Sequence, residues 1–144
     1  MDNYISQPDK YFVKDCVSHD EYIMQSYVYA MKIVNVPKVE FYSRREKKMV
    51  MQKIEGDNIS NIYGEEAEQV PKKIFNRVVR IVKKLYDNNI CYPDFTGYNF
   101  IIDKNNKIWI IDFEHAYGET SSEINEPNIQ EILAGKKSWN RDFM

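Results

Sequence analysis

The sequence of 144 residues is poor in cysteine and lacks long apolar runs. Its two cysteines, Cys16 and Cys91, lie far apart and outside any CxxC or histidine-rich context, which excludes a zinc site and a disulfide framework. No apolar run reaches the roughly 18 residues that a membrane-spanning helix needs. Residues 1–15 carry charges where a signal peptide would be apolar. We therefore expect a protein of a reducing, cytoplasmic compartment with no membrane partner.

Glycine is also scarce, and no charge of one sign dominates. The chain has five glycines, the first at Gly56, so residues 1–55 contain no glycine-rich phosphate loop. The formal charge is −2, whereas proteins that bind nucleic acid over a broad surface are usually basic, so nucleic acid is not the expected partner. A content of 43% hydrophobic and 29% charged residues is typical of a folded soluble domain, and the length favours a single one.

The first half of the chain predicts three strands and a helix. Residues 10–17 are rich in aromatic and β-branched side chains and predict a strand. Ser18, with Glu21 three positions later, matches a capping box and predicts a helix from there to about residue 33, stopped by Pro37. Residues 38–43 and 48–54 predict two antiparallel strands joined by a charged turn, the second ending at Gly56.

The second half predicts a long amphipathic helix, a hairpin and a short final helix. The long helix covers about residues 71–88, and its basic side chains predict a solvated face: Lys72, Lys73, Arg77, Arg80, Lys83 and Lys84. Residues 100–103 and 107–112 predict a hairpin, because the two asparagines between them tolerate the backbone of a tight turn. The last helix is expected over residues 128–134.

The segment from Ile90 to Tyr117 contains the polar residues most suggestive of chemistry. Asp94 and Asn99 lie five positions apart in a loop, and Asp112 follows a very apolar strand. Mg²⁺ prefers such oxygen ligands, together with substrate phosphates. Asn99 and Asp112 could therefore hold the metal, while Asp94 could accept a proton from an attacking hydroxyl.

These motifs resemble those of the protein kinase-like superfamily. The catalytic-loop pattern H-R-D-x-x-x-x-N corresponds to Tyr92, Pro93, Asp94 and Asn99, and D-F-G corresponds to Asp112-Phe113-Glu114. The D-F-E variant is similar to that of kinases acting on small molecules such as choline and aminoglycosides. The resemblance implies that Asp94 is the catalytic base and that Asn99 and Asp112 are metal ligands.

The same resemblance extends upstream over most of the chain. The segment MVMQKIEG resembles the strand and hinge between two kinase lobes, which implies that Gln52, Lys53 and Ile54 meet the base of ATP. FVKDC resembles the strand that carries the phosphate-binding lysine, which makes Lys14 the candidate. Glu21 is the first candidate for the glutamate that pairs with this lysine, although alignment through Pro37 would place Gln25 nearer that position.

The fold class implied by the resemblance is α+β, a minimal bilobal kinase-like fold. We expect one domain, with residues 1–54 forming a reduced β-rich N-lobe and residues 55–144 a truncated, helical C-lobe. ATP and Mg²⁺ are the implied cofactors.

Each candidate residue also has a plain structural interpretation. An aspartate such as Asp94 in a Pro-Asp turn commonly caps backbone amides, and Asn99 could simply brace its loop. Lys14 could protect an edge strand from aggregation. His19 and His115 belong to no ligand constellation, so exposure to solvent or a local hydrogen bond is expected of each.

Three functions follow from these residues. The first is an ATP- and Mg²⁺-dependent transferase acting on protein Ser or Thr hydroxyls. The second is a pseudokinase that regulates a partner chain or forms a homodimer, suggested by the missing glycine-rich loop and the short C-terminal region. The third is a small-molecule kinase, suggested by Glu114.

Overall fold

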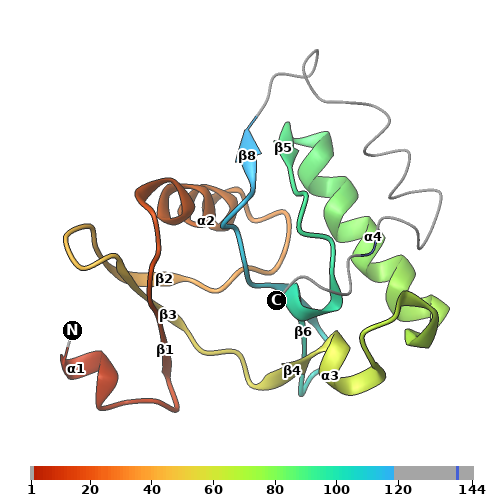
Figure 1. The fold of residues 1–144 in the computed structure, drawn as a ribbon, viewed down its shortest axis with the longest axis horizontal. Coiled ribbons are helices and arrows are strands. Elements are labelled where there is room, and N and C mark those ends of the chain that lie inside the picture. The colour runs from red at the N-terminus through yellow and green to blue at the C-terminus, as the bar shows by residue number, and fades with distance from the viewer. Residues whose placement is uncertain (1, 119–138, 140–144) are drawn as a thin grey trace.

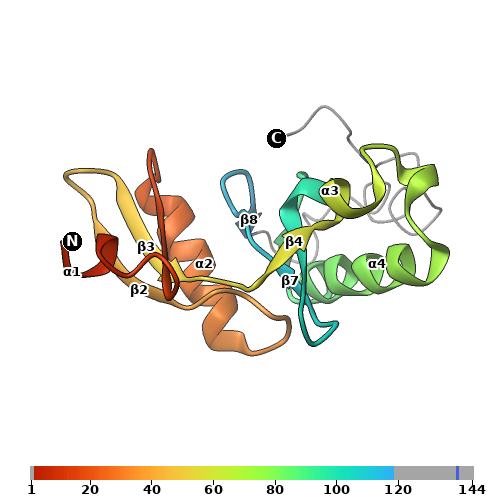
Figure 2. The same cartoon turned by 90° about the horizontal axis from the view of Figure 1, so that it is seen from below.

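The computed structural model describes residues 2–118 and 139, and two lobes are visible in it (Figure 1). The first lobe contains a small sheet and one helix, and the second contains the long helix and the remaining short strands. The two lobes lie side by side and are joined by the strand-to-strand linker that follows Gln52 (Figure 2). This is the bilobal α+β kinase-like fold predicted from the motifs.

The first lobe is built on a three-stranded antiparallel sheet with the order β1-β3-β2. Its elements are α1 (Asp2–Ile5), β1 (Tyr11–Lys14), α2 (His19–Met31), β2 (Val39–Ser43) and β3 (Lys48–Gln52). The central strand, β3, is the most apolar and buries Met49, Val50 and Met51, because it has a neighbour on both sides. Lys14 lies at the end of β1, opposite Met49.

Helix α2 begins where the capping pattern predicts. The Ser18 hydroxyl accepts a hydrogen bond from the backbone N–H of Glu21 at 3.1 Å, which satisfies one of the free donors at the helix start. The helix ends at Met31 rather than near residue 33, because Lys32 adopts a left-handed backbone with φ of 56°. The predicted stop at Pro37 is therefore wrong, and residues 32–36 form a separate connecting segment.

The second lobe contains a long helix packed against short antiparallel strands. Its elements are β4 (Gly56–Asn58), α3 (Ile59–Tyr63), η1 (Ala67–Gln69), α4 (Lys72–Asp87), β5 (Ile90–Cys91), η2 (Gly97–Asn99), β6 (Phe100–Asp103), β7 (Ile108–Ile110) and β8 (Tyr117–Gly118). The hairpin β6–β7 forms as predicted, with Asn106 at a φ of 64° in its turn. Gly56 does not end the hinge strand, because it begins a further strand, β4, which pairs with β6.

The larger hydrophobic core lies between α4 and the catalytic-loop region. Val78, Val82 and Leu85 of α4 are fully buried and form the apolar face of the predicted amphipathic helix. Phe75 and Trp139 add an aromatic cluster with Phe95, with ring centroids 5.3–5.8 Å apart. The helix expected over residues 128–134 lies outside the described residues. No helix in the described part of the chain has the length and apolar character to cross a membrane.

Gly56 is required by the close pairing of β4 with β6. A Cβ atom at this position would lie 2.1 Å from the carbonyl oxygen of Ile102, which is backbone and has little freedom to move. We expect Gly56→Ala to lower the free energy of unfolding by about 1–3 kcal/mol, the usual effect of overpacking. Thermal melting would measure this effect. Gly118→Ala is the matched control, because the nearest described atom is 3.9 Å away. Equal melting of both variants and the wild type would contradict the β4–β6 pairing.

Candidate active site

A cleft of about 410 Å³ lies between the two lobes and brings together residues from both. Its floor and walls are mostly apolar, from Phe12, Pro37, Met51, Ile101 and Ile111. The polar or hinge residues that line it are Lys14, Gln52, Lys53, Ile54, Tyr98, Asn99 and Asp112. The cleft therefore contains every sequence-predicted cofactor or metal residue except Glu21. Asp94, the predicted base, also lies outside it.

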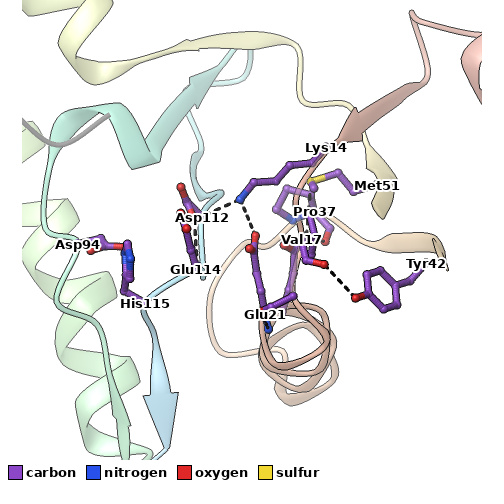
Figure 3. A network of polar contacts seen from close by, with 12 residues as sticks. Lys14, Val17, Glu21, Pro37, Tyr42, Met51, Asp94, Asp112, Glu114 and His115 are labelled. Atoms are coloured by element: carbon purple, nitrogen blue, oxygen red, sulfur yellow. Dashed lines mark hydrogen bonds and ion pairs between the residues drawn. The ribbon is translucent and has the colours of Figure 1, made fainter. Parts of the chain in front are cut away.

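Lys14 connects the two lobes at the mouth of this cleft. Its Nζ lies 2.5 Å from Oε2 of Glu21 and 3.3 Å from Oδ1 of Asp112 (Figure 3). Burial alone would lower the pKa of Lys14, but the two carboxylates, Asp112 foremost, outweigh it and raise the pKa above its ordinary value. The ammonium group is therefore charged at neutral pH and available to a ligand phosphate.

The helix cap explains why Glu21 reaches Lys14. Ser18 fixes the first turn of α2 by accepting from the backbone of Glu21, which leaves the Glu21 side chain free to turn towards β1. Gln25, the alternative partner, lies one turn further on, and its amide donates to the carbonyl oxygen of Pro37 at 3.0 Å instead. The ion pair with Lys14 therefore belongs to Glu21.

Asp112 follows the end of β7 by two residues and is held there by two hydrogen bonds. The N–H of Glu114 donates to its Oδ1 at 2.9 Å, and the hydroxyl of Tyr92 donates to its carbonyl oxygen at 2.5 Å. Burial raises the pKa of Tyr92 well above its ordinary value, so the phenol stays protonated and remains a donor. Tyr92 thus links the catalytic-loop region to the strand that presents Asp112.

Asp94 does not line the cleft and contacts His115 instead. The His115 Nδ1 and the Asp94 Oδ2 are 2.8 Å apart, and Figure 3 shows this pair on the other side of Asp112 from Lys14. Burial raises the pKa of Asp94, while the hydrogen bond from His115 acts in the opposite direction. The same hydrogen bond raises the pKa of His115, which favours the charged imidazolium beside the carboxylate.

Asn99 joins the region of Asp94 to the cleft. Its side-chain N–H donates to the backbone carbonyl of Asp94 at 3.0 Å, and its own backbone carbonyl accepts from Ile111 at 3.0 Å. Because the amide nitrogen is occupied, the side-chain oxygen of Asn99 remains as the polar atom for a cation at the cleft. The loop-bracing role and a ligand role of Asn99 are therefore compatible.

The donor set fits a hard divalent cation that is completed by a ligand. Asp112 and Asn99 line the same cleft and offer one carboxylate and one amide oxygen. Within residues 2–118, no three His, Cys, Asp or Glu side chains form a ready-made metal site. This matches the way Mg²⁺ is usually held, by one or two protein oxygens together with phosphates and water. Bound there, the ion would neutralise phosphate charge.

Sequence reasoning missed two groups of residues in this region. The apolar lining from Phe12, Met51 and Ile101 was not predicted, although alternation along β1 places Phe12 on the same side as Lys14. The side chain of His115 is half exposed, as expected, but its contact with Asp94, 21 positions away in the chain, was not predicted. Only a three-dimensional arrangement brings that pair together.

Comparison with known proteins gives one family over most of the chain. A family model described as the RIO domain matches residues 5–134. Among curated proteins, the chain is 32% identical over 94 residues to the EKC/KEOPS complex subunit BUD32 of Enterocytozoon bieneusi, covering 58% of this chain and 45% of that protein. It is 24% identical over 63 residues to the 3-deoxy-D-manno-octulosonic acid kinase of Photobacterium profundum, covering 44% and 27% respectively.

Solved structures show the same fold. The Cydia pomonella granulovirus kinase PK-1 matches with a TM-score of 0.58 at 16% identity, over 76% of this chain and 44% of that one. The Rv3197–erythromycin complex from Mycobacterium tuberculosis also matches with a TM-score of 0.58 at 16% identity, over 82% and 34%. The chain therefore spans less than half the length of each of these curated relatives and solved structures.

Proposed function

The chain belongs to the RIO domain family, within the protein kinase-like superfamily, and we propose that it is an ATP- and Mg²⁺-dependent phosphotransferase. The observation that carries this proposal is the convergence of Lys14, Asn99 and Asp112 on one cleft. Lys14 would bind ligand phosphates, and Asn99 and Asp112 would hold the metal. Gln52, Lys53 and Ile54 would present the linker backbone to the base of the nucleotide.

Asp94 would orient the acceptor hydroxyl and take its proton. The Asp94 carboxylate is buried and hydrogen-bonded to His115, and the side chain of Asn99, a proposed metal ligand, donates to the Asp94 backbone carbonyl. A carboxylate positioned beside a metal-bound phosphate is the arrangement that kinases use for this step. The proton would pass from the acceptor oxygen to Asp94 as that oxygen bonds to the γ-phosphorus of ATP, while the bond from this phosphorus to the bridging oxygen breaks and ADP leaves.

The acceptor we propose is a protein Ser or Thr hydroxyl, as expected from the resemblance to protein kinases. A second acceptor class, a sugar acid, is supported by the similarity to 3-deoxy-D-manno-octulosonic acid kinases. A partner chain is also proposed, because one relative is a subunit of a complex.

A transfer assay with radiolabelled ATP distinguishes these acceptor classes. The purified chain is incubated with γ-labelled ATP and Mg²⁺, together with a generic protein, the chain itself or 3-deoxy-D-manno-octulosonic acid. We expect label on protein, and label on the sugar acid alone would replace the protein acceptor. Absence of label on every acceptor, together with absence of Mg-ATP binding, would reject the phosphotransferase.

His115 is expected to set the acid limb of the pH profile. Asp94 must be ionised to act as a base, so kcat/KM falls as pH drops through the pKa of Asp94. The hydrogen bond from His115 opposes the upward effect of burial on that pKa. In His115→Gln the pKa of Asp94 should rise further, and the acid limb should move to higher pH. The measurement is kcat/KM against pH for both proteins. A shift to lower pH would contradict the contact.

A further inference from the structure

A basic groove lies where the end of α2 and the segment after it meet α4 and the β6–β7 hairpin. Two adjoining hollows of about 370 and 260 Å³ form it, and they share Asn35, Ile81, Lys84 and Ile108 as lining. Five cations line the groove: Lys32, Arg77, Arg80, Lys84 and Lys107. No carboxylate from the described residues lines either hollow. On a chain of formal charge −2, this gathers like charges in one place.

The groove is held in shape by contacts between three separate elements. The Asn35 side chain donates to the carbonyl oxygen of Ile108 at 3.1 Å, and the Asn35 carbonyl accepts from Ile110 at 3.0 Å. Arg77 donates to the carbonyl oxygen of Asn106 at 2.6 Å. These bonds fix the segment after α2 and the α4 helix against the β6–β7 hairpin. The groove is therefore preformed.

The cations of the groove differ from the lysines beside them. Lys83 on α4 pairs with Asp87, and Lys104 in the hairpin pairs with Glu55. Within residues 2–118, none of the five groove cations forms an ion pair with a carboxylate. Lys83 and Lys104 are thus neutralised and the groove cations are not, although Lys72 and Lys73 at the start of α4 also form no ion pair in the described part of the chain. An unneutralised basic groove attracts an anionic ligand.

The spacing of the charges indicates which kind of polyanion fits. Arg77, Arg80 and Lys84 lie on one face of α4 and span about 10 Å at 1.5 Å per residue. A stacked nucleic-acid strand carries one phosphate per about 3.4 Å, so about three phosphates match three cations. An extended acidic peptide directs only every second side chain to one face, about 7 Å apart, and would leave cations unmatched.

The lining between the cations is apolar and partly aromatic. Ile33, Ile81, Tyr29 and Trp109 lie among the basic residues, and Tyr29 is 38% exposed. Aromatic and apolar surface interleaved with cations is the usual arrangement for single-stranded nucleic acid, because bases stack on it while the backbone meets the charges. We propose that this groove binds a single-stranded nucleic acid. The proposal is independent of the phosphotransferase activity and goes beyond it.

Fluorescence anisotropy with a labelled 12-nucleotide oligouridylate tests the proposal without any nucleotide cofactor. The groove variant is Arg80→Glu/Lys84→Glu. The control is Arg44→Glu/Arg45→Glu, which makes the same charge change in the exposed β2–β3 turn. We expect at least a tenfold loss of affinity in the groove variant and less than a threefold loss in the control. With about three phosphates contacted, the wild-type affinity should fall about 20-fold between 50 and 200 mM salt.

Three outcomes would overturn the proposal. The first is equal loss in the groove and control variants, which would indicate attraction by net charge alone. The second is equally strong binding of a 12-residue oligoglutamate, which would indicate an acidic peptide as the ligand. The third is no binding of the oligonucleotide at 50 mM salt. Thermal melting of both variants accompanies the assay, and the substituted residues are exposed, so folding should be unchanged.

Discussion

Replacing Asp94 by asparagine is expected to slow phosphate transfer by about 10²–10⁴-fold, the range typical for loss of a general base. The change removes the charge and the proton-accepting ability while keeping the size of the side chain. The amide oxygen can still accept a hydrogen bond from His115. Asp94 does not line the cleft, so the affinity for Mg-ATP should change by less than about threefold. Single-turnover transfer and calorimetry together measure both quantities.

The control for Asp94→Asn is Asp87→Asn, which removes an exposed carboxylate at the end of α4 that pairs only with Lys83 among the described residues. Transfer should be unchanged in that variant. If Asp94→Asn instead kept its rate but melted at a lower temperature, Asp94 would be a loop-bracing residue. The alternative interpretation as a turn cap would then be correct, and another group would have to take the proton.

The fold was most predictable where one local interaction decides the backbone. Ser18 and Glu21 fix the start of α2 through a single hydrogen bond, so the sequence alone locates it. The end of the same helix was not predicted, because Lys32 adopts a left-handed conformation that no local residue type demands. Strand β4 was missed for a related reason. Gly56 suggested a strand end, but its small size permits close pairing with β6, a neighbour distant in sequence.

The candidate site also combines features that the sequence predicts with features that only the three-dimensional structure shows. Residues within one motif, such as Asp94 and Asn99, were predictable because their spacing in the chain is short. The choice between Glu21 and Gln25 as the partner of Lys14 needed the three-dimensional structure, because both lie on α2 one turn apart. The contact between His115 and Asp94 depends on the path of the chain after Phe113, which local sequence does not indicate. The net charge of the chain likewise does not reveal the basic groove, because its cations come from three separate segments.

The contact between Lys14 and Asp112 affects how the cleft would bind a phosphate. Lys14 contacts both Glu21 and Asp112, the latter at the longer distance of 3.3 Å. A ligand phosphate and its metal would compete for these same groups. We therefore expect a bound phosphate and its metal to weaken the contact between Lys14 and Asp112. On the proposed function, Asp112 would contact both the metal and Lys14.

Replacing Asp112 by asparagine is expected to abolish the stabilisation of the chain by Mg-ATP. A ligand at 100 times its Kd stabilises the native state by about 2.7 kcal/mol. For a domain of this size, that corresponds to a rise in Tm of about 5–10 °C. The new amide side chain would keep an oxygen for the Glu114 N–H, and Lys14 would keep Glu21, so the variant should fold. It would lose the charged ligand that the metal needs.

A thermal-shift titration measures this loss, with wild type, Asp112→Asn and the control Asp15→Asn, whose exposed carboxylate lies 3.7 Å from Lys48. Wild type and Asp15→Asn should respond to Mg-ATP, and both should respond less to ATP with a chelator. An equal rise in Tm for Asp112→Asn would show that Asp112 is not a metal ligand. Absence of any rise in the wild type would reject nucleotide binding itself. The RIO domain fold would then serve a role without ATP.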